Sequence, residues 1–400
     1  MFDESKESLF MKKHFAEYYS KNFVDSVPSV ENREFGFGVF KRKIANRNIS
    51  FKNADEMNSF LREKTPLFFS YSNSYYSFPA NTPMIEKKFI KSDLIYEFDA
   101  DEIKTSCRRE NNAWLCVKKF GEESLVHEIK SDGGTKQWFL EKSLIEAKKQ
   151  VFRLIDLLEN DFLFSRKNIS VNFSGKAGYH VHLRDPTLQN LNRKSRIEIV
   201  DYLTGQGIYY DNLGYEIEKK LICASGKGAW IKRINKGIKE FFEKDAKEIS
   251  LITNTPKKKV SDLLKAKKEI ISGIEKGYLI PIAPRKNKEF WKSVLDFVVQ
   301  TYNIPIDRQT SIDLHKIIRV PNTLHGETGF IAKEIPLVEI DKFDPFTDAV
   351  VFGEEKVKVF VKNAPKFYLK GKEFGPYNEE EVLVPLYCAI YLVGKGAELR

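Results

Sequence analysis

The sequence predicts an α+β protein in which a mainly helical segment interrupts a mixed unit of strands and helices. Strand-like apolar runs and amphipathic helical patterns alternate up to about residue 186, and strand-like runs return after residue 300. Between these parts, apolar residues such as Val260, Leu263 and Leu264 recur every three or four positions among lysines. We therefore expect residues 1–186 and 301–400 to form one α/β core, with residues 187–300 as a mainly helical insertion.

Each element of the core follows from its local periodicity. A first helix is expected within residues 1–22, where Phe10, Met11 and Phe15 stand at helical spacing. Two more helical stretches are expected at about Ala54–Leu61 and Lys142–Leu158. Strands are expected at Arg33–Phe40, Asn48–Phe51, Leu67–Tyr71, Leu94–Phe98, Ile169–Phe173, Tyr179–Leu183 and Lys356–Lys362.

Composition restricts the class of partner. Lys and Arg number 66 against 56 Asp and Glu, and the resulting charge of +10 favours a polyanion such as nucleic acid. The longest apolar run, Val382–Val393, contains Pro385 and is too short to cross a bilayer. The N-terminus lacks the apolar region of a signal peptide, and four scattered cysteines do not form a disulfide framework, so we expect a cytoplasmic protein. The lysines of 256–268 are interpreted as a solvated helix face rather than a phosphate contact.

The first chemical element is the run from Leu94 to Asp101. Asp99 and Asp101 stand two positions apart at a strand end, so both carboxylates face the same side, ~6.7 Å apart along the chain. Two acids held in this way repel each other unless a hard cation such as Mg²⁺ or Mn²⁺ lies between them. The alternative is an ordinary strand end with solvated acids.

The second element, Val171–Leu183, is a strand, a glycine-bounded turn and a second strand. Gly175 and Gly178 allow conformations in which successive amides line an anion nest, and Ser174 and Lys176 add a hydroxyl and a positive charge. His180 and His182 fall on one face of the outgoing strand. A hairpin without function, carrying two packed histidines, is the alternative.

The third element, Ile304–Phe330, brings acids, a basic residue and histidines into one stretch. Asp307 and Asp313 are its candidate acids, Arg319 follows a short apolar run, and His325 precedes a glycine turn. The second and third elements together hold four of the six histidines: His180, His182, His315 and His325. A buried Asp–Arg pair that joins two strands is the structural alternative.

The ordered set of motifs resembles the small, catalytic subunit of archaeal and eukaryotic DNA primases, and the archaeal form most closely. The matching motifs are Arg33-Glu34-Phe35, Phe98–Asp101, the Ser174–His180 turn, Ile317–Gly326 followed by Thr328-Gly329, and the ending from Asp348 to Tyr377. They occur in the family's order over nearly the whole chain, and together they are far more specific than any one of them.

The resemblance implies a catalytic core of two β-sheets flanked by helices. It makes Asp99, Asp101 and Asp307 the ligands of Mg²⁺ or Mn²⁺ in a two-metal nucleotidyl transfer. Asp307 is chosen over Asp313 because the family's third aspartate stands 12 positions before the basic residue matched by Arg319. It also assigns the incoming nucleotide's triphosphate to a set of five residues: Ser174, Lys176, His180, Arg319 and His325.

The resemblance further implies the partners and the setting of the reaction. These are a single-stranded DNA template, a primer duplex, nucleoside triphosphates and a large primase subunit in a heterodimer, working in DNA replication at the nucleoid. Two departures from the family stand out. Ala177 occupies a position where many relatives have Arg or Lys. The cysteine and histidine knuckle of relatives is reduced to Cys107 and Cys116, with His127 as a distant third ligand, so we expect no structural zinc.

Three other functions compete with the primase. A glycosyltransferase with an Asp-x-Asp metal site would explain Asp99 and Asp101, but not the Ser-Gly turn or the third aspartate. A non-catalytic nucleic-acid-binding scaffold is disfavoured by the intact acids, although Ala177 speaks for it. A repair polymerase of the same superfamily differs in whether it needs a primer.

Overall fold

The computed structural model describes residues 5–100, 107–110, 113–118, 121–131, 134–139, 141–282 and 286–400. The chain divides into two compact units, one made of Met1–Ile197 and Pro305–Arg400 and the other of Glu198–Ile304. The helical insertion predicted from the sequence covered residues 187–300. The observed second unit, Glu198–Ile304, begins 11 residues later and ends four residues later. Helices and antiparallel sheets are mixed, which confirms the predicted α+β class.

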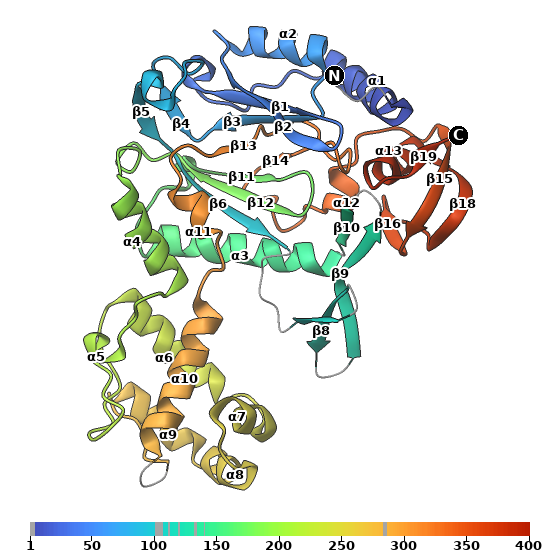
Figure 1. Ribbon diagram of the computed structural model, residues 1–400. Coiled ribbons are helices and arrows are strands. Elements are labelled where there is room, and N and C mark those ends of the chain that lie inside the picture. The colour runs from blue at the N-terminus through green and yellow to red at the C-terminus, as the bar shows by residue number, and fades with distance from the viewer. Residues whose placement is uncertain are drawn as a thin grey trace. The chain divides into compact units, whose positions relative to one another are not determined.

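Two four-stranded antiparallel sheets form the first unit's framework. The first sheet has the order β13 (Ile317–Arg319), β3 (Phe68–Ser72), β1 (Phe35–Val39), β2 (Arg42–Ile49). The second sheet has the order β14 (Glu334–Ile335), β11 (Ile169–Phe173), β12 (Gly178–Leu183), β6 (Leu94–Asp99). Figure 1 shows α1 (Lys6–Lys21) and α2 (Ala54–Lys64) on the outer side of the first sheet, and α3 (Glu141–Asn160) against the second.

Side chains from the two sheets meet between them. The Tyr71 hydroxyl of β3 lies 3.5 Å from Nδ1 of His182 on β12, and Arg184 donates to that hydroxyl at 3.2 Å. Strand alternation sends Tyr96 and Phe98 of β6 to a buried face, so the side chains at 97 and 99 share the opposite face. The second sheet therefore presents polar side chains to the space between the sheets.

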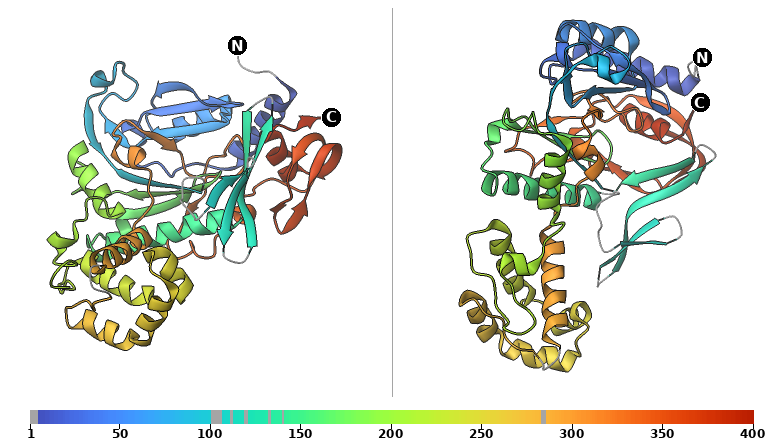
Figure 2. Two further views of the ribbon diagram at one scale, coloured as in Figure 1. Left: turned by 60° about the horizontal axis from the view of Figure 1, so that its bottom comes forward. Right: turned by 60° about the vertical axis from the view of Figure 1, so that its left-hand side comes forward.

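Other elements complete the first unit. They are β4 (Ser74–Tyr76), β5 (Phe89–Ser92), β7 (Cys107–Glu110), β8 (Ala113–Lys118), β9 (Gly121–Ser131), β10 (Gly134–Phe139), α11 (Arg308–Ile312), α12 (Pro345–Asp348), β15 (Lys356–Ala364), β16 (Phe367–Leu369), β17 (Lys372–Phe374), β18 (Tyr377–Pro385), α13 (Leu386–Gly394) and β19 (Glu398–Leu399), with single 3₁₀ turns at Val30–Asn32, Met84–Lys87 and Arg166–Asn168. These elements include a third four-stranded sheet, in the order β10, β9, β8, β7, and a three-stranded sheet, in the order β18, β15, β19. Trp138 of β10 packs against Phe367 and Tyr391. Figure 2 shows the strands of the β7–β10 sheet beside the C-terminal elements.

The second unit is helical. Its core gathers Trp230, Ile234, Trp291 and Val294 with other apolar residues. Its helices are α5 (Tyr210–Leu213), α6 (Ala229–Phe241), α7 (Ala246–Thr253), α8 (Lys257–Lys265), α9 (Lys267–Glu275) and α10 (Asn287–Tyr302), while α4 (Arg193–Thr204) runs across the boundary between the units. Lys257, Lys258 and Lys259 are exposed, as expected of a solvated face.

Most predicted elements are confirmed to within a few residues, and two differences are instructive. The strand predicted at Asn48–Phe51 is β2, which already begins at Arg42 because it pairs back on β1 after a tight turn at Lys41. Its residues are mostly polar and exposed, so no apolar alternation marks it. The apolar run Val382–Val393 divides at Pro385 into the end of β18 and α13. Among the described residues, no helix has both the length and the apolar character needed to span a membrane.

Candidate active site

The acidic side of the candidate site lies at the end of β6. Asp99 stands opposite Gly178 in the β6–β12 register, and a Cβ at position 178 would come within 2.6 Å of the Asp99 carboxylate. The same Cβ would meet the Phe98 carbonyl oxygen first, so glycine at 178 allows the close approach of the β6 backbone as well as the position of the Asp99 carboxylate. Asp101 lies outside the described residues.

Asp307 lies beside the same strand, although it comes from a distant part of the sequence. Its backbone N–H points to the Glu97 carbonyl at 3.5 Å, and its Oδ1 accepts from the amides of Gln309 and Thr310 at the start of α11. The residues that the structure describes contain no group of three or more His, Cys, Asp or Glu side chains placed to hold a metal. The described part of the predicted triad is thus Asp99 and Asp307, both with hard oxygen donors on the β6 side.

The second predicted element is the β11–β12 hairpin, and its turn is held by a side chain. The amides of Lys176, Ala177 and Gly178 point to Oγ of Ser174 at 3.1–3.4 Å. The expected anion nest is therefore already closed on the serine oxygen, and Ser174 acts first as the organiser of the turn.

The second and third elements touch at their turns. Gly175 has φ +83°, and a Cβ there would lie 2.8 Å from Cβ of His325. The Thr328 hydroxyl donates to the Gly175 carbonyl at 2.6 Å. Two glycine turns separated by about 150 residues in the sequence are thereby joined into one surface.

Arg319 provides a half-buried positive charge near His325, because both side chains pack against the ring of Phe68. Its Nη1 donates to the Phe69 carbonyl at 3.3 Å, and its guanidinium lies 5.1 Å from the Phe68 ring centre. Its Nε is buried without a hydrogen-bond partner among the described residues. Burial lowers the pKa of Arg319 to about 10, so the group keeps its charge at neutral pH. A cation whose buried Nε has no hydrogen-bond partner among the described residues fits an anionic ligand.

Further cations surround Glu327. Lys176 forms an ion pair with the Glu327 carboxylate at 2.6 Å. Burial raises the pKa of the Glu327 carboxyl, but Lys176, Lys43 and Lys395 together hold it below its ordinary value. Partial loss of solvation and then the charge of Lys176 lower the pKa of Lys43, whose charge also interacts with Arg319 and Asp99. Lys43 of β2 thus adds a cation that the sequence did not indicate.

Three buried histidines of the site, His180, His182 and His325, are neutral at pH 7. Burial lowers the pKa of His180 to about 4 and those of His182 and His325 well below 6.5. Asn172 links the first two, since its amide nitrogen lies 3.4 Å from Nδ1 of His180 and its Oδ1 accepts from Nε2 of His182 at 2.9 Å. Nε2 of His180 then carries the proton and faces the carboxylate of Glu97 at 3.7 Å.

The protonated nitrogen of His325 can be assigned in the same way, from the partner of its other ring nitrogen. Its Nδ1 accepts from the Glu327 amide at 3.2 Å, so its Nε2 holds the proton of the neutral ring and can donate to a ligand. His315, by contrast, pairs with the Tyr76 hydroxyl at 3.2 Å, and Asp313 accepts from the His315 amide. These two residues have structural partners of their own.

Four residues that contact the site were not predicted from the sequence: Glu97, Thr310, Lys316 and Glu327. Glu97 had a readable signal, because it stands two residues before Asp99 and so belongs to the same strand face. The others had none, because their contacts depend on how α11 and the 326–329 turn pack against the sheet.

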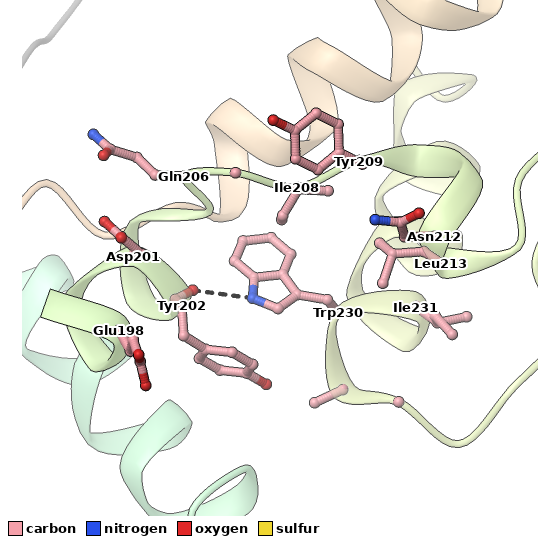
Figure 3. A pocket seen from close by; sticks show the side chains of 13 residues that line it. Glu198, Asp201, Tyr202, Gln206, Ile208, Tyr209, Asn212, Leu213, Trp230 and Ile231 are labelled. Atoms are coloured by element: carbon pink, nitrogen blue, oxygen red, sulfur yellow. Dashed lines mark hydrogen bonds between the residues drawn. The ribbon is translucent and has the colours of Figure 1, made fainter. Parts of the chain in front are cut away.

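A separate cavity of about 460 Å³ lies within the helical unit (Figure 3). Trp230 is one of its lining residues, and its indole N–H donates to the Tyr202 carbonyl at 3.0 Å. Ile208, Tyr209 and Leu213 add apolar lining, and Glu198 and Asp201 add acids. None of the predicted site residues lines this cavity.

Carboxylates that can hold a divalent cation, with positively charged side chains nearby, are a combination that stabilises the charge of a phosphate group during its transfer. A family model described as DNA primase small subunit matches residues 141–337. Proteins named DNA primase small subunit PriS are similar over nearly the whole chain. That of Methanothrix thermoacetophila is 30% identical and that of Methanococcoides burtonii 28%, each with 98% of both chains covered. That of Nitrosopumilus maritimus is 28% identical with 96% of both covered.

The chain therefore belongs to the DNA primase small subunit family, and the relatives it matches are archaeal. It is a nucleotidyltransferase. This confirms the resemblance and removes the glycosyltransferase alternative.

Proposed function

We propose that the chain is the catalytic subunit that synthesises primers, joining nucleoside triphosphates on a single-stranded DNA template, and that it works as a heterodimer with a large primase subunit. The family supports this function, and one observation about the site carries the assignment of the substrate. The half-buried guanidinium of Arg319 has an Nε without a hydrogen-bond partner among the described residues, and it packs on Phe68, which also contacts His325 and lies beside Gly326.

The triphosphate is assigned to the residues around that surface. Lys176 and Arg319 supply charge, and Nε2–H of His180 and of His325 supplies neutral donors. Ser174 contributes by holding the turn in place. The overall charge of +10 suits binding of a template and primer by their phosphate backbones, without reading their sequence.

A divalent cation is assigned to Asp99, Asp101 and Asp307. The donor set fits, because Mg²⁺ and Mn²⁺ prefer carboxylate oxygens and the described members, Asp99 and Asp307, lie beside the same strand. Bound there, such a metal would lower the pKa of the attacking 3′-hydroxyl and stabilise the charge of the departing pyrophosphate. Orientation of the phosphates by Lys176 and Arg319 is the part of catalysis that the protein's own cations perform.

Two binding titrations test the assignment of the triphosphate. Lys176→Ala and Arg319→Ala should weaken binding of a nucleoside triphosphate far more than binding of single-stranded template DNA, because DNA is held by many dispersed cations. Lys258→Ala, at an exposed lysine of the helical unit, is the matched control and should change neither. Equal losses of nucleotide and DNA binding would place Lys176 and Arg319 on the template path instead.

A product assay separates primer synthesis from repair-type polymerisation. Synthesis on a single-stranded template without any primer, in Mg²⁺ or in Mn²⁺, is the expected result. Activity that appears only after a primer is added would favour the repair polymerase.

A further inference from the structure

Glu97 lies between the acidic and the phosphate-facing parts of the site. It precedes Asp99 by two residues on β6 and stands directly opposite His180 in the register of β6 and β12. Its side chain is only 14% exposed. Removing a carboxylate from water is costly unless hydrogen bonds and charges compensate, so its partners are informative.

Those partners divide between its two oxygens. Oε2 accepts from the Thr310 hydroxyl at 2.8 Å and lies 3.6 Å from the Lys316 ammonium. Oε1 lies 3.7 Å from Nε2 of His180. One oxygen thus faces α11 and the other faces a residue assigned to the triphosphate.

The Thr310 hydroxyl touches two carboxylates at once. It lies 2.8 Å from Oε2 of Glu97 and 2.5 Å from Oδ2 of Asp307, while Lys316 donates to its oxygen at 2.8 Å. A hydroxyl has a single proton, so at any moment it donates to only one of the two. Lys316 fixes the oxygen, and the proton can rotate between Glu97 and Asp307 without any other movement.

The choice matters because Oδ1 of Asp307 is already used by the amides of Gln309 and Thr310. Oδ2 is the oxygen that remains for a cation, and a hydroxyl proton aimed at it competes with that cation. The Glu97 carboxylate is a second acceptor with the same charge, so the Thr310 hydroxyl can donate to it and leave Oδ2 of Asp307 free for the cation.

We propose that Glu97 is a positioning residue for Asp307. When Oδ2 of Asp307 binds a divalent cation, Glu97 accepts the hydrogen bond from the Thr310 hydroxyl in its place. The inference rests on the proposed metal role of Asp307. It assigns to Glu97 and Thr310 a role outside the predicted set of site residues.

A double-mutant cycle on Mn²⁺ binding tests this, with binding measured by electron paramagnetic resonance on the full chain without nucleotide or DNA. Glu97→Gln keeps the side chain's shape but offers a neutral acceptor, so the proton stays on Asp307. Mn²⁺ affinity should fall about 10-fold, as is typical when an outer-shell partner of a ligand is changed. In a Thr310→Val background, which has no hydroxyl, the same change should cost about 2-fold or less, because the two residues act as one unit.

Controls separate this inference from the proposed function. Glu63→Gln, at an exposed glutamate of α2, should leave Mn²⁺ affinity unchanged. Asp307→Asn should lower it strongly; if it does not, the metal assignment itself fails. If Asp307→Asn weakens binding while Glu97→Gln does not, or if Glu97→Gln costs the same in both backgrounds, only the positioning role is wrong. Thermal unfolding checks each variant, and Thr310→Ala replaces Thr310→Val if the latter does not fold.

Discussion

The ammonium group of Lys176 lies 2.6 Å from the carboxylate of Glu327, so a cation assigned to the substrate's phosphates is paired with an acid of the protein itself. The pair is formed by the two glycine turns that Thr328 joins to Gly175. Both side chains are partly exposed, at 20% and 26%, which leaves the pair open to exchange with a ligand. Binding of a triphosphate at Lys176 must therefore compete with Glu327.

Glu327→Gln should tighten the binding of nucleoside triphosphates. An ion pair of this exposure is worth up to about 1 kcal/mol, so its loss corresponds to a decrease of about 5-fold in the dissociation constant. Fluorescence titration with a labelled nucleotide measures this, and Glu339→Gln, at an exposed glutamate, is the control. Weaker nucleotide binding in Glu327→Gln would mean that Glu327 orders Lys176 rather than competing with the substrate.

Asp307→Asn and Asp101→Asn should abolish primer synthesis and leave the fold intact. Asparagine caps a helix as well as aspartate does, so α11 keeps its N-cap in the first variant. We expect activity to fall by more than the ~10–100-fold typical of changes around a metal ligand. Asp313→Asn is the matched control, since Asp313 accepts from the His315 amide and is assigned no metal. Near-normal synthesis by either of the first two variants, with unchanged thermal stability, would refute the metal assignment.

Gly175→Ala should destabilise the protein more than Gly371→Ala. Both glycines have positive φ, +83° and +70°, and alanine in this region costs about 1–2 kcal/mol. Only at position 175 does the new Cβ meet an obstacle, 2.8 Å from Cβ of His325, while the space at 371 is open. Chemical denaturation gives the two free energies of unfolding. The proposal that the two turns form one site also requires Gly175→Ala to weaken nucleotide binding and Gly371→Ala to leave it unchanged.

Stability should fall when the pH drops below about 6.5. Burial holds the pKa of His182 well below its ordinary value of 6.5, so the unfolded chain binds a proton in a pH range where the folded chain does not. The contribution is complete above about 6.5 and is lost progressively as the pH falls towards the folded pKa. His182→Gln should flatten the dependence of the unfolding free energy on pH between 6.5 and 5. An unchanged slope would show that other groups, such as His325, dominate it.

The purified protein should contain no stoichiometric zinc, and Cys116→Ser should retain most of the activity. The β7–β8 register places Cys107 opposite Cys116, whereas His127 of β9 is opposite Ala113, and a structural site needs four converging ligands. Elemental analysis after dialysis against a chelator measures the metal. About one zinc per chain, lost in Cys107→Ser, would contradict this prediction.

The sequence by itself determined those features that depend on local periodicity. The alternation of β6 placed Asp99 on a polar strand face, and the glycine spacing of residues 174–178 predicted a hairpin turn between two strands. The order of the motifs identified the family, because each motif keeps its residue types and spacing whatever the rest of the chain does. The exposure of the lysines in α8 could also be predicted, because a run of like charges on a helix is stable only where water solvates it.

Tertiary structure alone decided how these pieces act on one another. Glu97 and Thr310 are 213 residues apart, and they touch only because α11 packs beside β6. The same holds for Lys176 and Glu327, which lie in different motifs and meet where the two turns pack together. Periodicity constrains neighbours along one element, whereas contacts between elements depend on which surfaces bury each other and on a few close approaches such as Gly175 to His325. The competition for Lys176 and the shared proton of Thr310 arise from those contacts.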